Sequence, residues 1–414
     1  METSASQPPL KALERVMRET TERLAFECAC PSTQTPHWSD FHWRIAQAVT
    51  ALHGVSSLLS KRLRWQGPRP WCEFLEAQWH HTFNRHQGLT ALIAKVDSAA
   101  RAADIGLVAL KGVALHELAI YAPGERPMAD LDLLVNEREL AASFAMLGTL
   151  GYLPSHSTRK EHVFSPPGPS RTAKLGEHAA NALKIELHTR IAERLPLRES
   201  DITELLLPER LEAGLHGYGS VEALMTHLLL HAAGDMRGRS LRLIQLNDIA
   251  ALAPRLGMDQ WARVLGAERA ARAWWAFPPL ALTARYYPHV IAPEVLAGAR
   301  AVCPRVLRSI CRRQRLSDVS FSYLWVQFSP GIEWSRSLSE ALEYAHSRIF
   351  PTAAVRAEIR QCENTQLWAR DTAWSRLSRP RRVARWLVSR CPRDATMLPV
   401  RAALEAGALS DESI

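Results

Sequence analysis

Residues 130–135, DLDLLV, place two aspartates in an otherwise apolar segment that is typical of a strand. Because side chains alternate along a strand, Asp130 and Asp132 would share one face, roughly 7 Å apart, with Leu131 and Leu133 on the other. Two carboxylates that lose water on a sheet face repel each other unless a cation lies near both. Mg²⁺ is a hard cation that accepts one or two carboxylates and completes its coordination with water and phosphate oxygens. The pair therefore indicates a magnesium site.

The segment before this strand would bring cations to the same place. Residues 107–110, LVAL, predict a buried strand that ends at Lys111, whose ammonium would point toward the aspartates. Gly112, without a side chain, would let the backbone approach a phosphate. Arg126, on a loop punctuated by glycine and proline just before Asp130, would bind phosphate with its planar guanidinium. These three residues are the expected contacts to a phosphorylated ligand.

A second alternating segment would supply a third carboxylate. In residues 181–191, NALKIELHTRI, Glu186 and His188 lie on the polar side of the alternation. If this strand neighbours the first, Glu186 would join Asp130 and Asp132 as the third catalytic, metal-binding carboxylate. Three carboxylates can hold two ions, one beside an attacking hydroxyl and one on a triphosphate. His188 shares the face of Glu186 and would orient that carboxylate or contact the nucleotide.

The block LKGVALHELAIYAPGERPMADLDLLV, residues 110–135, resembles the signature of an uncharacterised nucleotidyltransferase family, LKG…RPMxDxDLLV, within the DNA polymerase β-like superfamily. IELHTRI, residues 185–191, resembles its third-carboxylate strand, and the resemblance extends over roughly residues 80 to 355. It implies an α+β fold with a small mixed sheet, the palm, flanked by helices. It also implies Mg²⁺ dependence, transfer of a nucleotide from a nucleoside triphosphate, and Asp130, Asp132 and Glu186 as metal ligands.

Two features depart from that superfamily. Its Gly-Ser phosphate-binding turn is replaced by Lys111-Gly112, and its third carboxylate, commonly Asp, is Glu186. The first hypothesis is nucleotidyl transfer to a hydroxyl-type acceptor, which is a small molecule, a peptide or protein side chain, or an RNA end. A tailoring transferase that uses another activated donor, such as a sugar nucleotide, is the alternative enzyme. A non-catalytic nucleotide-binding protein is the third hypothesis.

Periodicity divides the 414 residues into three parts. The expected division is an N-terminal helical region at 1–85, the palm domain at 86–195 and a C-terminal helical region at 196–414. The first palm helix, 87–104, carries one apolar stripe, and Gly106 is expected to cap its end. From 196 onward the pattern is helical to the end.

Composition restricts the compartment and the partners. No uncharged apolar stretch approaches the roughly 18 residues of a membrane span, and the N-terminus lacks the apolar core of a secretory signal. A cytoplasmic protein is therefore expected, with its seven scattered cysteines as reduced thiols. The net charge is +9, and arginines cluster around Trp386 at 376–393. Such a cluster can hold a nucleic-acid backbone, but solvated helix ends account for it better, so a nucleic-acid partner is not favoured.

Three polar residues in the later helices have two interpretations each. His227 and His231 are spaced to bind zinc, but HLLLH lacks the glutamate of the H-E-x-x-H motif. We expect them to make structural hydrogen bonds, with lining of a nucleotide cleft as the alternative. Asp248 interrupts the apolar helix segment QLNDIAAL and is expected to pair with a nearby arginine rather than reach a substrate.

Overall fold

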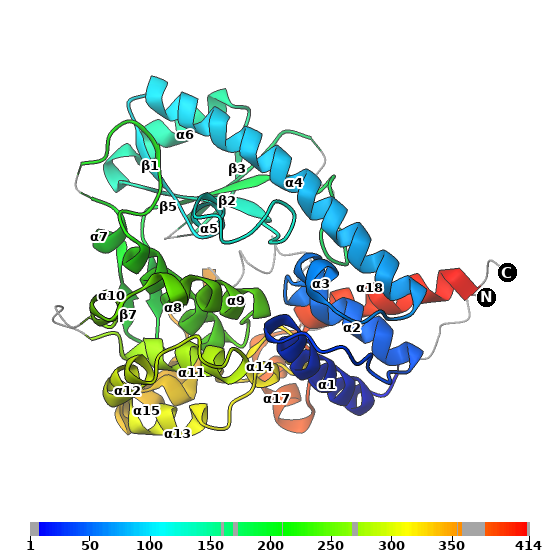
Figure 1. Ribbon diagram of the computed structural model, residues 1–414. Helices are drawn as coiled ribbons and strands as arrows, with labels where there is room; N and C mark the ends of the chain where they lie inside the picture. Colours follow the sequence, from blue (N-terminus) through cyan, green and yellow to red (C-terminus); the bar gives the residue numbers. More distant parts are fainter. Residues whose placement is uncertain are drawn as a thin grey trace.

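A computed structural model of the protein is built around a six-stranded mixed sheet with helices on both faces (Figure 1). The structure describes residues 8–158, 161–168, 173–208, 210–266, 272–353, 355–357 and 377–411. Across the sheet the strands lie in the order β3 (Leu153–Ser157), β4 (Glu161–Ser165), β5 (Lys184–His188), β2 (Asp130–Val135), β1 (Gly106–Ala109) and β8 (Gly214–His216). The expected α+β fold class is confirmed.

The centre of the sheet is the parallel pair β2 and β5, whose register places Asp132 opposite Glu186. On its other edge β2 pairs antiparallel with β1. Because side chains alternate along β2, Leu131 and Leu133 point to one face while Asp130 and Asp132 point to the other. The two faces of the sheet therefore differ in chemistry, one apolar and one rich in carboxylates.

Two helices cover the apolar face, α4 (Arg69–Ala102) and α6 (Leu140–Thr149). Leu89 of α4 and Leu131 and Ile185 of the sheet are at most 1% exposed within this packing. Each such side chain stabilises the fold by about 1.5–3 kcal/mol relative to its exposed state. This packing fixes which face of the sheet is buried and so leaves the carboxylates on the opposite face.

The other long helices fall into two groups, one before the sheet in the chain and one after β8. Those before it are α1 (Leu10–Ala29), α2 (Asp40–Leu52) and α3 (Ser56–Arg62). Those after β8 are α8 (Val221–Gly238), α9 (Leu243–Leu252), α10 (Met258–Val264), α11 (Phe277–Tyr286), α12 (Pro293–Val302), α13 (Arg305–Cys311), α14 (Leu316–Val319), α15 (Leu338–Ile349), α17 (Arg379–Val388) and α18 (Asp394–Asp411). Figure 1 shows α8 and α9 beneath the sheet, and α18 beside α2.

Short elements connect these parts. They are α5 (Gly112–Glu117), η1 (Glu137–Glu139), β6 (Ala192–Arg194), β7 (Glu199–Asp201), α7 (Thr203–Leu206), η2 (Ala253–Arg255), η3 (Trp274–Ala276) and η4 (Ile332–Trp334). The strands β6 and β7 form a separate antiparallel pair.

Three details differ from the sequence-based expectations. α4 runs unbroken through the expected boundary at residue 85. The strand β8, at Gly214–His216, pairs in parallel with β1 although helices were expected from 196 onward, because three residues are too few to display an alternating pattern. The expected cap Gly106 instead opens β1, and Asp104, with φ 57°, takes the left-handed conformation after α4.

Other expectations concern the membrane, the cysteines and the basic cluster. Among the described helices none combines the length and the apolar character needed to cross a bilayer. The six cysteines within the described ranges are free thiols. Of the basic cluster at 376–393, Arg376 and the side chains of Arg379 and Trp386 lie outside the described residues. Arg393 is half-buried rather than fully solvated, and desolvation lowers its pKa to about 10.

Candidate functional site

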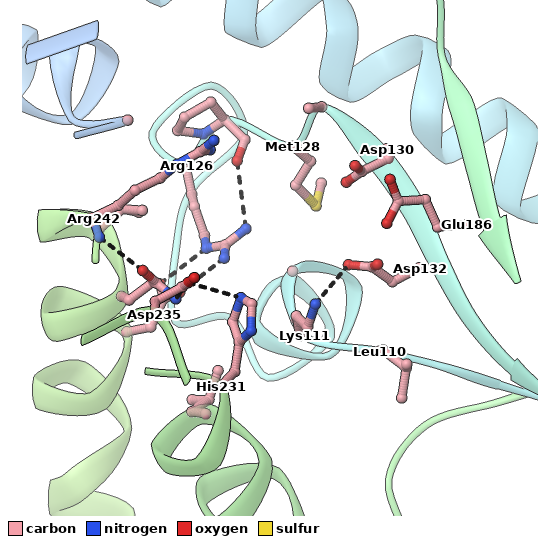
Figure 2. A pocket seen from close by; sticks show the side chains of 18 of the residues that line it. Leu110, Lys111, Arg126, Met128, Asp130, Asp132, Glu186, His231, Asp235 and Arg242 are labelled. Carbon is pink, nitrogen blue, oxygen red and sulfur yellow. Dashed lines mark hydrogen bonds and ion pairs between the residues drawn. The ribbon is translucent and has the colours of Figure 1, made fainter. Parts of the chain in front are cut away.

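Three carboxylates gather on the face of the sheet that looks toward α8 and α9 (Figure 2). Asp130 and Asp132 come from β2, and Glu186 comes from β5, in register with Asp132. All three line one cavity of about 380 Å³. The structure therefore brings together the residues that the sequence predicts as metal ligands.

A buried arginine that the sequence analysis missed fixes the start of both strands. Arg85 of α4 donates from Nη2 to the carbonyl of Ala129, 2.9 Å away, and from Nη1 to the carbonyl of Asn181, 2.6 Å away. Its Nε also lies 3.0 Å from Glu177, which lines the cavity. Because these carbonyls lie just before β2 and β5, Arg85 helps to hold the two strands in the register that aligns their carboxylates.

Asp132 is the best-partnered of the three carboxylates. Lys111 Nζ lies 3.5 Å from its Oδ2, and His188 Nε2 lies 3.1 Å from its Oδ1. Burial acts to raise the pKa of Asp132, but Lys111 and His188 outweigh it and hold that pKa well below its usual range. Burial likewise acts to lower the pKa of Lys111, and the surrounding carboxylates raise it. Asp132 and Lys111 are therefore both charged at neutral pH.

Asp130 and Glu186 lie close enough to change each other's protonation. Burial and then the charges of Asp130 and Asp132 raise the pKa of Glu186 to about 9. Burial and Asp132 also raise the pKa of Asp130, against which Lys111 and a hydrogen bond from Glu186 act. In the metal-free protein Glu186 is thus a protonated carboxyl that donates to Asp130.

This donor set suits a divalent cation. Ligand atoms of Asp132, Glu186 and His188 lie within 4.8 Å of one another, and Asp130 borders the same space. Like charges that are forced together on a sheet face gain from a cation that replaces the proton between them. Carboxylate oxygens are the preferred ligands of Mg²⁺, and an imidazole is also accepted by Mn²⁺ and other transition metals.

Lys111 is held by an unusual backbone conformation. Its φ is 44° and its ψ is −102°, values that side-chain-bearing residues rarely adopt. Its N–H donates to the hydroxyl of Tyr218 at 3.0 Å, and that hydroxyl lies 2.7 Å from Nδ1 of buried His227. His227 therefore has the structural role that was expected of it, and strain at Lys111 is stored next to the carboxylates.

Gly112 is also required by local packing. A Cβ at this position would lie 2.6 Å from Nη1 of Arg126 and 2.7 Å from Sδ of Met128. The missing side chain therefore makes room for two protein side chains. Gly112, Arg126 and Met128 all line the cavity.

Arg126 is tied to the helical region. Its Nε and Nη2 donate to Oδ1 and Oδ2 of Asp248 on α9, at 2.9 and 2.8 Å. The hydroxyl of Tyr121 also donates to Asp248, at 2.7 Å. This pairing is the one expected for Asp248. Nη1 of Arg126 takes no part in it and donates to the carbonyl oxygen of Pro127 at 3.4 Å.

The opposite wall of the cavity comes from α8, α9 and the segment between them (Figure 2). Asp235 accepts hydrogen bonds from Ser240 Oγ at 2.9 Å and Gln245 Nε2 at 2.8 Å, and His231 Nε2 lies 3.5 Å from it. Burial and then the charge of Lys111 lower the pKa of His231 to about 4. His231 thus lines the cavity, the less favoured of its two interpretations. Arg242 also lies on this wall, and no local sequence pattern marked it.

Comparison with known proteins agrees with this geometry. A family model described as uncharacterised nucleotidyltransferase matches residues 39–291, more than half of the chain. The match includes the three carboxylates on one wall and Arg242 on the other. No curated protein and no solved structure matches the chain. The family implies an enzyme that transfers nucleotidyl groups with a nucleotide substrate and a divalent metal. The chain therefore belongs to the uncharacterised nucleotidyltransferase family.

Proposed function

We propose that the protein uses Mg²⁺ to transfer a nucleotidyl group from a nucleoside triphosphate to a hydroxyl-type acceptor. The observation that carries this proposal is the alignment of Asp132 with Glu186 across β2 and β5, with Asp130 beside them and Lys111 at 3.5 Å from Asp132. These groups come from separate parts of the chain and converge on one cavity wall.

Asp130, Asp132 and Glu186 would hold one or two ions. When bound, the ions would supply Lewis-acid chemistry that favours the deprotonated form of the acceptor hydroxyl and neutralises the charge that develops on the leaving group. His188 would keep Asp132 oriented through its 3.1 Å contact. Lys111, through its ammonium, and Arg126, through Nη1, would contact phosphate oxygens, and Gly112 would let the backbone approach them.

The proposed reaction forms a phosphoester bond and breaks a phosphoanhydride bond. The acceptor oxygen bonds to the α-phosphorus of the donor, the bond from that phosphorus to the bridging oxygen of the β-phosphate breaks, and pyrophosphate leaves. The hydroxyl proton is released to water. Positioning and charge neutralisation by fixed groups account for most of the catalysis in such transfers.

A donor screen tests this function. Purified protein is incubated with Mg²⁺ and each nucleoside triphosphate or sugar nucleotide, with the protein itself, peptides, small alcohols and RNA as acceptors. Release of pyrophosphate supports nucleotidyl transfer, and release of a nucleoside diphosphate supports the sugar-nucleotide alternative. The variants Asp130→Asn and Asp132→Asn should lose turnover and keep their fold, whereas the exposed control Asp259→Asn should keep both.

Calorimetric measurement of nucleotide binding can contradict the proposed function. If wild-type protein binds no nucleoside triphosphate in the presence of Mg²⁺ or Mn²⁺, the proposed function is wrong. Binding without any turnover over the whole acceptor panel would favour a nucleotide-binding protein.

A further inference from the structure

Among the described residues, the cations that line the cavity are Lys111, Arg126 and Arg242. Lys111 lies 3.5 Å from Asp132, and Arg126 is doubly hydrogen-bonded to Asp248. Within the described ranges no carboxylate lies within the 4.0 Å of an ion pair from Arg242. The guanidinium of Arg242 is thus the cation in this wall whose charge is not already matched by a neighbouring carboxylate.

The backbone of Arg242 is firmly held although its side chain is exposed to the cavity. Its N–H donates to Gln245 Oε1 at 2.8 Å. The next two N–H groups, of Leu243 and Ile244, donate to Nδ1 and the carbonyl oxygen of His53, at 3.0 and 3.2 Å. His53 is fully buried, so the start of α9 is anchored to the core. Arg242 therefore projects into the cavity from a rigid base.

An aromatic ring orients the guanidinium. Arg242 Cζ lies 5.2 Å from the centroid of the Phe321 ring, which also lines the cavity. Arg393 lies 5.6 Å from the same ring and donates to the carbonyl of Arg239, which keeps the ring in place. Contact with a ring face restrains the guanidinium plane but uses none of its five N–H donors. The donors of Arg242 remain available to a ligand.

A bound triphosphate would need a cation on the cavity wall opposite the three carboxylates. The three carboxylates occupy the sheet wall, and Figure 2 shows Arg242 on the wall across from them. A nucleoside triphosphate brings several negative charges into this space, and its outer phosphates extend away from the reacting α-phosphorus. A planar guanidinium with free donors matches two phosphate oxygens at once. Lys111 and Arg126 are less available for this task because each already faces a carboxylate.

We propose that Arg242, oriented by Phe321, binds the β- and γ-phosphates of the donor, so that the triphosphate bridges the sheet and α9. This inference rests on the proposed function and adds a phosphate-binding residue from outside the LKG…RPMxDxDLLV block. It also assigns the anionic part of the donor, rather than the acceptor, to the wall formed by α9.

Calorimetry on the full-length protein with Mg²⁺ tests this proposal. The probes are inorganic tripolyphosphate, α,β-methylene-ATP, which cannot transfer its nucleotide, and AMP. Arg242→Ala should weaken tripolyphosphate and α,β-methylene-ATP binding by roughly 10- to 100-fold, as expected for lost charge-assisted hydrogen bonds, and should leave AMP binding unchanged. Arg242→Lys should restore part of the loss, because an ammonium keeps the charge but not the paired donors. Phe321→Leu should give an intermediate loss.

The matched control is Arg255→Ala, an exposed arginine just after α9 that does not line the cavity. It should bind all three probes as the wild type does. If Arg242→Ala binds tripolyphosphate as tightly as the wild type, or loses only AMP binding, the inference about Arg242 is wrong while the proposed function stands. A turnover assay in which this variant shows only a raised KM for an acceptor would have the same meaning. Absence of Mg²⁺-dependent binding in the wild type would instead reject the proposed function, so the two failures are distinguishable.

Discussion

Arg126, on the loop before β2, and Asp248, on α9, form a two-pronged ion pair with N–O distances of 2.9 and 2.8 Å. The side chain of Asp248 is 1% exposed and that of Arg126 is 11% exposed. The pair joins the loop that leads into the carboxylate strand to the helix that forms the opposite wall. It therefore sets the spacing of the two walls of the cavity.

Removing one partner of this pair should be costly. Asp248→Ala leaves the guanidinium of Arg126 buried without its carboxylate, and we expect the free energy of unfolding to fall by about 3–5 kcal/mol. Denaturant unfolding measures the change, with exposed Asp259→Asn as a control that stays near wild type. Arg126→Met combined with Asp248→Leu should recover much of the loss, since no charge is stranded. A single variant as stable as the wild type would contradict this view of the pair.

Mg²⁺ should stabilise the protein more strongly as the pH rises. The pKa of Glu186 is raised from 4.5 to about 9, so between these values the folded state binds the additional proton and the stability of the metal-free protein falls with increasing pH. Metal binding replaces that proton, and its effect on the melting temperature should grow from about pH 6 to about pH 9. Thermal unfolding with and without Mg²⁺ over this range measures it. Glu186→Gln should flatten the pH dependence; an Mg²⁺ effect that shrinks with pH would count against this site.

The backbone strain at Lys111 should be visible by comparing two variants. With φ at 44°, an alanine at this position keeps the strain and a glycine relieves it, so Lys111→Gly should be more stable than Lys111→Ala by about 1–3 kcal/mol. Both variants lose the ammonium and should bind tripolyphosphate more weakly. The control pair at exposed Lys95, inside α4, should show the opposite order, with alanine more stable by about 0.5–1 kcal/mol. If the alanine variant is the more stable one at both positions, residue 111 is not strained.

His188 should support metal binding through Asp132. Its Nε2 lies 3.1 Å from Asp132 Oδ1, and removing a group that orients a metal ligand typically weakens affinity about 10- to 100-fold. His188→Ala should therefore weaken Mn²⁺ binding by that factor in calorimetry. His162→Ala is the matched control, because His162 lies on the adjacent strand β4 and contacts Ser157 instead of the carboxylates. Equal Mn²⁺ affinity in the two variants would remove His188 from the site.

The carboxylate wall could be predicted from the sequence because strand alternation fixes which side chains share a face. That rule placed Asp130 with Asp132 and Glu186 with His188, and the parallel pairing of β2 with β5 brings the two sets together. The edge strand β8 could not be predicted, because a strand of three residues is too short to show an alternation of apolar and polar side chains.

The opposite wall of the cavity could not be predicted from the sequence, for a different reason. His231 and Asp235 lie on α8, and Arg242 lies immediately before α9. The orientation of these two helices depends on tertiary packing, and helical periodicity identifies a buried face without identifying its neighbour. The partner of Arg126 is 122 residues away in the chain. For the same reason the sequence analysis assigned Arg126 to phosphate, whereas among the described residues that line the cavity Arg242 is the cation without a carboxylate partner.

The pairing of Gly106 in β1 with Gly214 in β8 has a consequence for biosynthesis. At translation rates of about 5–20 residues per second, roughly 5 to 20 s separate the emergence of the two strands from the ribosome. During that interval β1 has a hydrogen-bonding edge open on the nascent polypeptide, and long-range strand pairings of this kind form slowly. A ribosome-bound chain halted before residue 214 would therefore present that edge to chaperones or to neighbouring nascent chains.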